Sequence, residues 1–223
     1  MSGEALVLLS GLGSDEDTWR DEVAALGGEP LVPRGNSIAE MARDILSRAP
    51  ARFALAGHSM GGYVALEIAL VAPERISRLA LVNTSAAADT PNQREARLRT
   101  IAVLESKGIG PLVRTIPPLM GGDPAVQARV AAMLERAGTE RMLREQRACL
   151  ARADRTAELG AIAAPTLVVG AADDLIVPPR GSRGLAQGIP GARLTMLRKA
   201  GHVTPMTRAA TTVKLLQGWL AQA

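Results

Sequence analysis

Short runs of apolar residues alternate with segments of helical periodicity along most of this chain. A run of wholly apolar residues is typical of a strand in a parallel sheet, because helices cover both faces of such a sheet. Parallel neighbours need a crossover connection, which the intervening helical segments supply. The pattern predicts an α/β fold with a doubly wound, mostly parallel sheet. The runs, some interrupted, lie at residues 5–9, 30–33, 53–56, 79–82, 166–169 and 192–197.

The alternation stops between residues 86 and 160, where the chain is helical in pattern and rich in Arg. The pairs Thr90-Pro91, Asp123-Pro124 and Thr139-Glu140 each combine a capping residue with a helix start. We expect this segment to be a helical cap inserted over the carboxyl ends of the strands. It belongs to a single domain over residues 1–223.

Composition excludes several classes of protein. With 223 residues and 47% hydrophobic content, the chain is long enough for one domain with a sizeable core. No window approaches the roughly 18 apolar residues of a membrane helix, so no membrane partner is expected. The 26 basic residues are interleaved with 22 acidic ones, and only four residues are aromatic, which argues against nucleic-acid binding. A single Cys and the lack of a secretory signal predict a cytoplasmic protein.

The segment Gly57-His-Ser-Met-Gly61 fits the pattern G-x-S-x-G between a predicted strand and a predicted helix. This pattern places a nucleophilic serine on a sharp strand-to-helix turn, where small residues on either side let the turn close. Ser59 is therefore the candidate nucleophile. A Rossmann or Walker phosphate loop is disfavoured, because neither glycine pattern is present here.

A serine nucleophile needs a base, and the chain has only two histidines. His58 lies inside the turn, where we expect its side chain to point away from the Ser59 hydroxyl. His202, in the loop before the last predicted helix, is the candidate base. Zinc sites are built mostly from His and Cys ligands, and this chain has only two His and one Cys. No metal is therefore expected.

The base needs a carboxylate to orient it, and the order Ser, acid, His places that carboxylate between Ser59 and His202. The loop after the strand at residues 166–169 contains Asp173 and Asp174. One of the two can face the histidine, and we expect the other to be a solvated turn residue.

These segments, in this order, resemble the α/β-hydrolase superfamily, in particular its small single-domain esterase-like members. The family pattern Pro-x-Leu-x-x-x-Gly-x-x-Asp-x-x-x-Pro favours Asp174 as the acid when counted from Pro165 or from Pro178, and Asp173 when counted from Gly170. The family's first hairpin has no counterpart here, so we expect about six strands. The resemblance covers nearly the whole chain, through residues 8–13, 57–62, 72–75, 79–82, 165–174 and 201–202.

The resemblance also implies an oxyanion hole made by the backbone amides of Leu12 and Met60. Ser10 stands where the family usually has His. This changes the side chain that supports the loop, but the hydrogen-bond donor is still the backbone N–H of Leu12. The implied activity is that of a serine hydrolase that cleaves a small carboxylic ester or related acyl compound through an acyl-enzyme, without a cofactor. Its partner is a small-molecule substrate, and the sequence does not indicate an oligomeric state.

Two alternatives remain open at this point. The same triad serves other reactions, such as hydrolysis of a lactone or a carbon–carbon bond, a lyase reaction or perhydrolysis, because fold does not determine chemistry. The other alternative is a ligand-binding protein without catalytic activity on the same fold.

Overall fold

The computed structural model describes residues 4–222 and contains a six-stranded sheet in the order β2-β1-β3-β4-β5-β6. All neighbouring strands in this part of the chain are parallel, and no antiparallel hairpin is present in it, as predicted. The strands are β1 (Leu6–Leu9), β2 (Glu29–Leu31), β3 (Phe53–His58), β4 (Ile76–Val82), β5 (Thr166–Ala171) and β6 (Arg193–Leu197).

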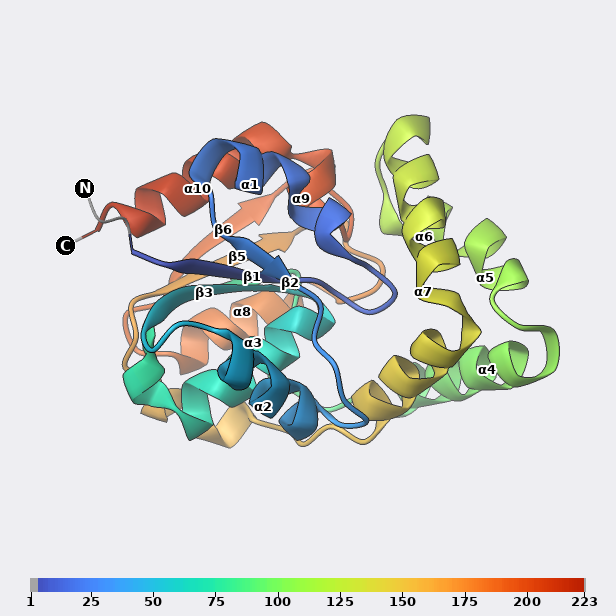
Figure 1. The fold of residues 1–223 in the computed structure, drawn as a ribbon, viewed down its shortest axis with the longest axis horizontal. Helices are drawn as coiled ribbons and strands as arrows, with labels where there is room; N and C mark the ends of the chain where they lie inside the picture. Colours follow the sequence, from blue (N-terminus) through green and yellow to red (C-terminus); the bar gives the residue numbers. More distant parts are fainter. Residues whose placement is uncertain (1–3, 223) are drawn as a thin grey trace.

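Helices cover both faces of the sheet, and the helices between β4 and β5 lie beyond its carboxyl edge (Figure 1). On one face lie α2 (Ile38–Arg48), α3 (Met60–Val71) and α8 (Arg180–Gly188); on the other lie α1 (Arg20–Leu26), α9 (Thr204–Thr207) and α10 (Ala209–Leu220). Residues 4–222 also contain the short 3₁₀ helices η1 (Glu16–Trp19), η2 (Pro73–Arg75) and η3 (Thr156–Ala161).

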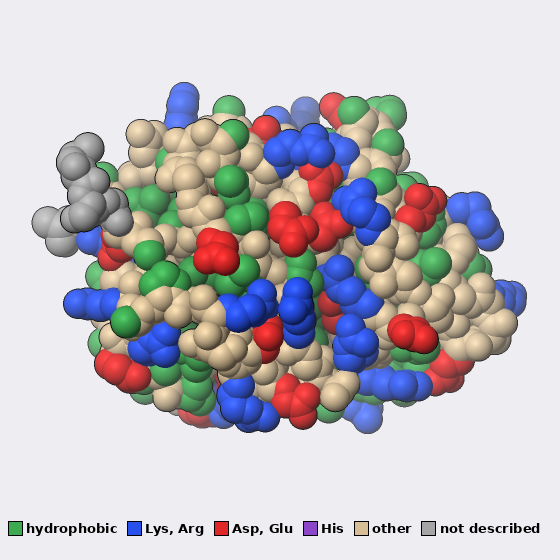
Figure 2. Space-filling model, viewed as in Figure 1, with side chains coloured by type: hydrophobic (Ala, Val, Ile, Leu, Met, Phe, Trp, Pro, Cys, Tyr) green, Lys and Arg blue, Asp and Glu red, His purple; other side chains and the backbone are tan. Residues whose placement is uncertain are grey.

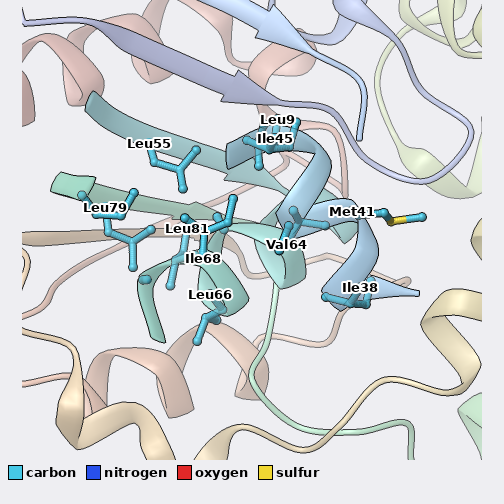
Figure 3. Close-up of a cluster of buried hydrophobic side chains, with 14 of the residues drawn as sticks. Leu9, Ile38, Met41, Ile45, Leu55, Val64, Leu66, Ile68, Leu79 and Leu81 are labelled. Carbon is cyan, nitrogen blue, oxygen red and sulfur yellow. The ribbon is translucent and has the colours of Figure 1, made fainter. Parts of the chain in front are cut away.

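The alternation of side chains along β1, β3, β4 and β5 places residues of each of these strands in both hydrophobic cores. Val7 and Leu9 of β1 contact the core under α2 and α3, whereas Leu6 and Leu8 contact the core under α10. Figure 3 shows the first core, in which side chains of β1, β3 and β4 point toward those of α2 and α3. The two cores therefore require the apolar runs of these inner strands, and such runs are the feature that the sequence displays.

The insertion between β4 and β5 contains α4 (Pro91–Lys107), α5 (Gly110–Thr115), α6 (Pro117–Met120) and α7 (Pro124–Leu150). Thr90 caps α4 with a capping box, and Asp123 caps α7 by accepting from the N–H groups of Ala125 and Val126. Gly138, at φ 67° and ψ 178°, breaks α7 directly before Thr139. The helix start predicted at Thr139 is thus confirmed, because α7 consists of two helical segments that meet at the kink of Gly138.

Both ends of the described chain meet at Arg78 of β4. Its Nε lies 3.1 Å from Oε2 of Glu4, and its Nη2 donates to the carbonyl of Gln222. The two ends lie at the opposite side of the molecule from the insertion (Figure 1). No helix within residues 4–222 combines the length and the apolar character needed to cross a bilayer.

Glu22 of α1 is a buried carboxylate, and within the described residues neither of its oxygens has a hydrogen-bond partner. Burial raises the pKa of Glu22 from 4.5 to about 8. A buried carboxylate without hydrogen bonds favours its neutral form, because ionisation there loses the solvation that water gives.

This carboxylate makes the stability depend on pH. Between about pH 4.5 and 8 the unfolded chain releases the Glu22 proton while the folded chain keeps it, so the free energy of unfolding falls as the pH rises. The free energy of unfolding of Glu22→Gln should therefore exceed that of the native protein by a margin that grows to roughly 4 kcal/mol at the upper end of this pH range. Urea unfolding at several pH values measures the difference, with exposed Glu74→Gln as the control. Parallel pH profiles of the native protein and Glu22→Gln would contradict the assignment.

Candidate active site

Ser59 lies in a strained turn between β3 and α3. Its φ of 53° and ψ of −117° are rare for a residue with a side chain. The turn closes only because its neighbours are small. A Cβ on Gly57 would lie 2.4 Å from the Gly61 carbonyl oxygen, and a Cβ on Gly61 would lie 2.3 Å from the carbonyl oxygen of Leu9. The G-x-S-x-G spacing is thus a steric requirement of this turn.

Ser59, His202 and Asp174 meet at the carboxyl edge of the sheet. Oγ of Ser59 lies 2.8 Å from Nε2 of His202, and Nδ1 of His202 lies 2.9 Å from Oδ2 of Asp174. The side chains of His202 and Asp174 are 2% and 0% exposed. Three residues from the ends of β3, β5 and β6 therefore form a continuous hydrogen-bonded chain, shielded from solvent at its acid end.

Asp174 is held in its ionised form. Burial acts to raise the pKa of this carboxyl, but the neighbouring His202, the N–H of Val177 and the side chain of Asn83 outweigh it and hold the pKa below its usual value. Oδ1 accepts from the N–H groups of Ile176 and Val177 at 2.9 Å each, and Oδ2 accepts from Nδ2 of Asn83 at 2.9 Å. The carboxylate is thereby oriented as well as charged.

Asn83 and Thr204 are polar residues of the site that sequence reasoning missed. Asn83 follows β4 directly and, at φ 48°, has a rare backbone conformation. Oγ1 of Thr204 donates to Oδ1 of Asn83 at 2.6 Å, and this leaves the Asn83 amide free to donate to Asp174. The available signal was a polar residue at the carboxyl end of a central buried strand.

Asp173, the alternative acid, does not contact His202. We expected the second aspartate to be a solvated turn residue, and this expectation is confirmed, because Asp173 is exposed and lies in a turn. Its carboxylate also accepts from the N–H groups of Ala200 and Gly201 at 3.1 and 3.2 Å. It joins the loop after β5 to the loop that carries His202.

His58 is buried and contacts the backbone of His202 instead of the Ser59 hydroxyl. Its Nε2 lies 2.9 Å from the carbonyl oxygen of His202, so Nε2 carries the proton and donates it. Burial and the adjacent His202 lower the pKa of His58 to about 3. His58 is therefore a neutral donor that joins β3 to the loop of His202, a contact that sequence reasoning did not foresee.

The loop after β1 passes beside the serine. A Cβ on Gly11 would lie 3.1 Å from Cβ of Ser59 and 3.0 Å from Nδ1 of His58. Within the part of the chain that the structure describes, the N–H groups of Leu12 and Met60 have no acceptor. Oγ of Ser10 donates to the Asp15 carbonyl at 2.8 Å, which shows how a Ser at this position supports the loop.

Metal-binding side chains are not gathered in the part of the chain that the structure describes. Among residues 4–222, no three His, Cys, Asp or Glu side chains form a group that could hold a metal ion.

Comparison with known proteins identifies the family. The model of the alpha/beta hydrolase family matches residues 6–215. The chain belongs to the alpha/beta hydrolase family. Among the relatives of this hydrolase is a protein of Variovorax paradoxus (strain S110) named "Putative carbamate hydrolase RutD". It is 34% identical, and the alignment covers 99% of this chain and 92% of the relative.

Solved structures of other hydrolases share the fold closely. The enol-lactonase from Burkholderia xenovorans LB400 superimposes with a TM-score of 0.89 at 28% identity, covering 100% of this chain and 93% of that one. A thermophilic esterase from Thermogutta terrifontis gives a TM-score of 0.87 at 26% identity, covering 98% and 89%. The chain is thus an alpha/beta hydrolase over nearly its whole length.

The steric closure of the serine turn is testable. Gly61→Ala places a methyl group against the backbone of β1, which cannot yield easily, so we expect a loss of about 2–3 kcal/mol in the free energy of unfolding. Gly218→Ala on α10 meets no atom within 4 Å and is the control, with an expected gain of up to about 1 kcal/mol. Urea unfolding measures both. Equal stability of Gly61→Ala and the native protein would contradict the steric argument.

Proposed function

We propose that this protein is a serine hydrolase that cleaves a small carboxylic ester or a related acyl compound. The observation that carries the proposal is the hydrogen-bonded chain from Oγ of Ser59 through His202 to Asp174, at 2.8 and 2.9 Å. In this proposal Ser59 is the nucleophile, His202 is the general base, and Asp174 holds the tautomer and stabilises the charged form of His202.

The first half of the reaction forms an acyl-enzyme. Oγ of Ser59 attacks the substrate carbonyl carbon as Nε2 of His202 takes its proton, and the carbonyl oxygen becomes an oxyanion. The backbone N–H groups of Leu12 and Met60 donate to that oxyanion. The tetrahedral intermediate then collapses, the bond to the leaving group breaks, and His202 gives its proton to the leaving group.

The second half releases the acid. Water attacks the acyl carbon, His202 accepts a proton from that water, and the bond to Oγ of Ser59 breaks as His202 returns the proton to the serine. The unpaired N–H groups of Leu12 and Met60 support this role, because they are free to donate to an oxyanion without first breaking another hydrogen bond.

The surroundings of the loop favour an aliphatic acyl group. Leu12 packs against an apolar cluster of the insertion and α9 that includes Met142, Val203 and Met206, and that contains no aromatic side chain within residues 4–222. Recognition by stacking on an aromatic ring is therefore not expected. The acyl group would be selected by its contacts with these apolar side chains and by its fit to the space between them.

The names of relatives favour a second candidate for the bond that is cleaved. The relative named RutD carries the name of a carbamate hydrolase, and a solved relative is an enol-lactonase. Both reactions are acyl transfers that the same three side chains can perform, so a carbamate or a lactone is the alternative substrate class. Retention of all three triad side chains in hydrogen-bonding geometry argues against a ligand-binding protein without activity.

An active-site-directed fluorophosphonate tests the nucleophile. We expect stoichiometric labelling of the native protein at Ser59, located by mass spectrometry of the digested protein, and no labelling of Ser59→Ala. The two proteins are then compared over a panel of short-chain esters, carbamates and lactones, which identifies the bond cleaved. Equal labelling of both proteins would overturn the mechanism. Turnover of every panel compound by Ser59→Ala at the native rate would do the same.

The two aspartates are expected to respond differently to the same substitution. Asp174→Asn removes the charge that stabilises the His202 cation and permits the wrong tautomer, so kcat should fall roughly 10³- to 10⁴-fold. Asp173→Asn keeps an oxygen that can accept from Ala200 or Gly201, and kcat should fall less than about tenfold. Steady-state kinetics measure both. A larger loss in Asp173→Asn than in Asp174→Asn would assign the acid to Asp173.

A further inference from the structure

The longest helix of the insertion, α7, contacts the loop that follows β1 at several points. Arg129 pairs with Asp17 and Arg136 pairs with Asp15, while Arg141 donates to the carbonyl of Ser14. Figure 2 shows acidic and basic side chains gathered on this face, over the junction between η1 and α7. The loop that carries Leu12 is therefore covered and held by the insertion as well as by the sheet.

Glu145 is the contact of α7 that reaches deepest into this loop. Its Oε2 accepts from the Gly13 N–H at 2.7 Å, and its Oε1 pairs with Nε of Arg141 at 2.6 Å. The residue is 1% exposed, whereas the Arg136 side chain of the outer pair is 53% exposed. Exposed pairs contribute little to stability, but removing one partner of a buried charged hydrogen bond is costly. Among the contacts of α7 described above, the one from Glu145 is the most strongly constrained.

The bonded loop is a tight turn whose geometry sets the direction of the Leu12 N–H. The Ser14 N–H donates to the Gly11 carbonyl at 3.2 Å, and Gly13 has the positive φ of 67° that a type II turn puts at its third residue. In the trans peptide between Gly11 and Leu12, the N–H points opposite to the C=O. Because that carbonyl faces Ser14, the Leu12 N–H is directed away from the inside of the turn.

Contacts of α7 fix this turn from its outer side. Glu145 accepts from Gly13, Arg141 donates to the Ser14 carbonyl, and a Cβ on Gly13 would lie 2.6 Å from Sδ of Met142. The Leu12–Gly13 and Ser14–Asp15 peptide groups are thereby tied to one helix. A donor for a developing oxyanion is effective only when its position is fixed before the reaction, so the support of this turn bears directly on the rate.

We propose that Glu145 is a positioning residue of the oxyanion hole, which holds the turn at Gly11–Ser14 so that the Leu12 N–H points at the carbonyl oxygen under attack. This inference rests on the proposed function, since it assigns support to a donor of that mechanism. It makes the insertion part of the catalytic apparatus in addition to any role as a cover. Glu145 itself touches neither the substrate nor the reacting atoms.

The test compares Glu145→Met, Glu145→Gln and Glu105→Ala. Met removes the acceptor but keeps the length and apolar volume of the side chain, so the helix packing is retained. Gln keeps an oxygen that accepts from the Gly13 N–H. Glu105 pairs with Arg147 on the surface of the same insertion, is half exposed, and is the control.

For Glu145→Met we expect kcat to fall about 10- to 100-fold with KM changed less than about threefold, because the oxyanion forms only during the reaction. The affinity for a short alkyl boronic acid, which forms a tetrahedral adduct with the serine, should fall by a similar factor. Glu145→Gln should recover most of kcat, and Glu105→Ala should match the native protein. All rates are expressed per fluorophosphonate-titrated site, so that a loss of folded protein is not counted.

A native kcat and native boronic acid affinity in Glu145→Met would overturn the inference, as would equal losses in Glu145→Met and Glu145→Gln. Should Glu145→Met not fold, Arg141→Met takes its place, since it removes the guanidinium that holds both Glu145 and the Ser14 carbonyl, and the same signature is expected. Native protein that fluorophosphonate does not label at Ser59 would instead refute the proposed function. If the native protein is labelled and active, and Glu145→Met is unaffected, only the proposed role of Glu145 is refuted.

Discussion

The close approach of α3 to the end of β1 determines where the other parts of the candidate site lie. Gly61, in the first turn of α3, packs directly on the carbonyl of Leu9, where no side chain fits. The loop that follows β1 is thereby brought beside Ser59, and the positive end of α3 faces the same space. Parallel strands then bring the loops of β4, β5 and β6 to the same edge of the sheet. One backbone contact without side chains thus determines the separation between the serine and the loop of Leu12.

Much of the fold and part of the site could be predicted from sequence because their signals are local. Apolar runs mark the strands, and the pattern around Ser59 reflects steric limits within a few residues of chain. The partners of Asp174 could not be predicted in this way. Asn83 and Thr204 are ordinary polar residues far from Asp174 in the sequence, and only the pairing of β4 with β5 brings Asn83 next to Asp174. The contact of Glu145 with Gly13 likewise depends on how α7 folds back over the sheet, which no spacing in the sequence reveals.

The two histidines illustrate how burial separates residues of one type. His58 and His202 have ring centres 5.1 Å apart, and two adjacent imidazolium cations would repel each other. Burial keeps His58 neutral, and its single proton is used in the hydrogen bond to the His202 carbonyl. Asp174 lies against the other ring and is ionised. The arrangement leaves one imidazole, that of His202, in contact with both a carboxylate and the serine hydroxyl.

The junction at Arg78 has a consequence for the connectivity of the chain. Since this one side chain binds both Glu4 and Gln222, the two ends lie within the span of a single residue's contacts, remote from Ser59. A short peptide could join Glu4 to Gln222, and new ends could then be opened in an exposed connection elsewhere. A chain permuted in this way would keep all the residues that form the contacts of the carboxyl edge. The same sheet and the same loops could therefore be built from a chain in which the strands follow one another in a different order.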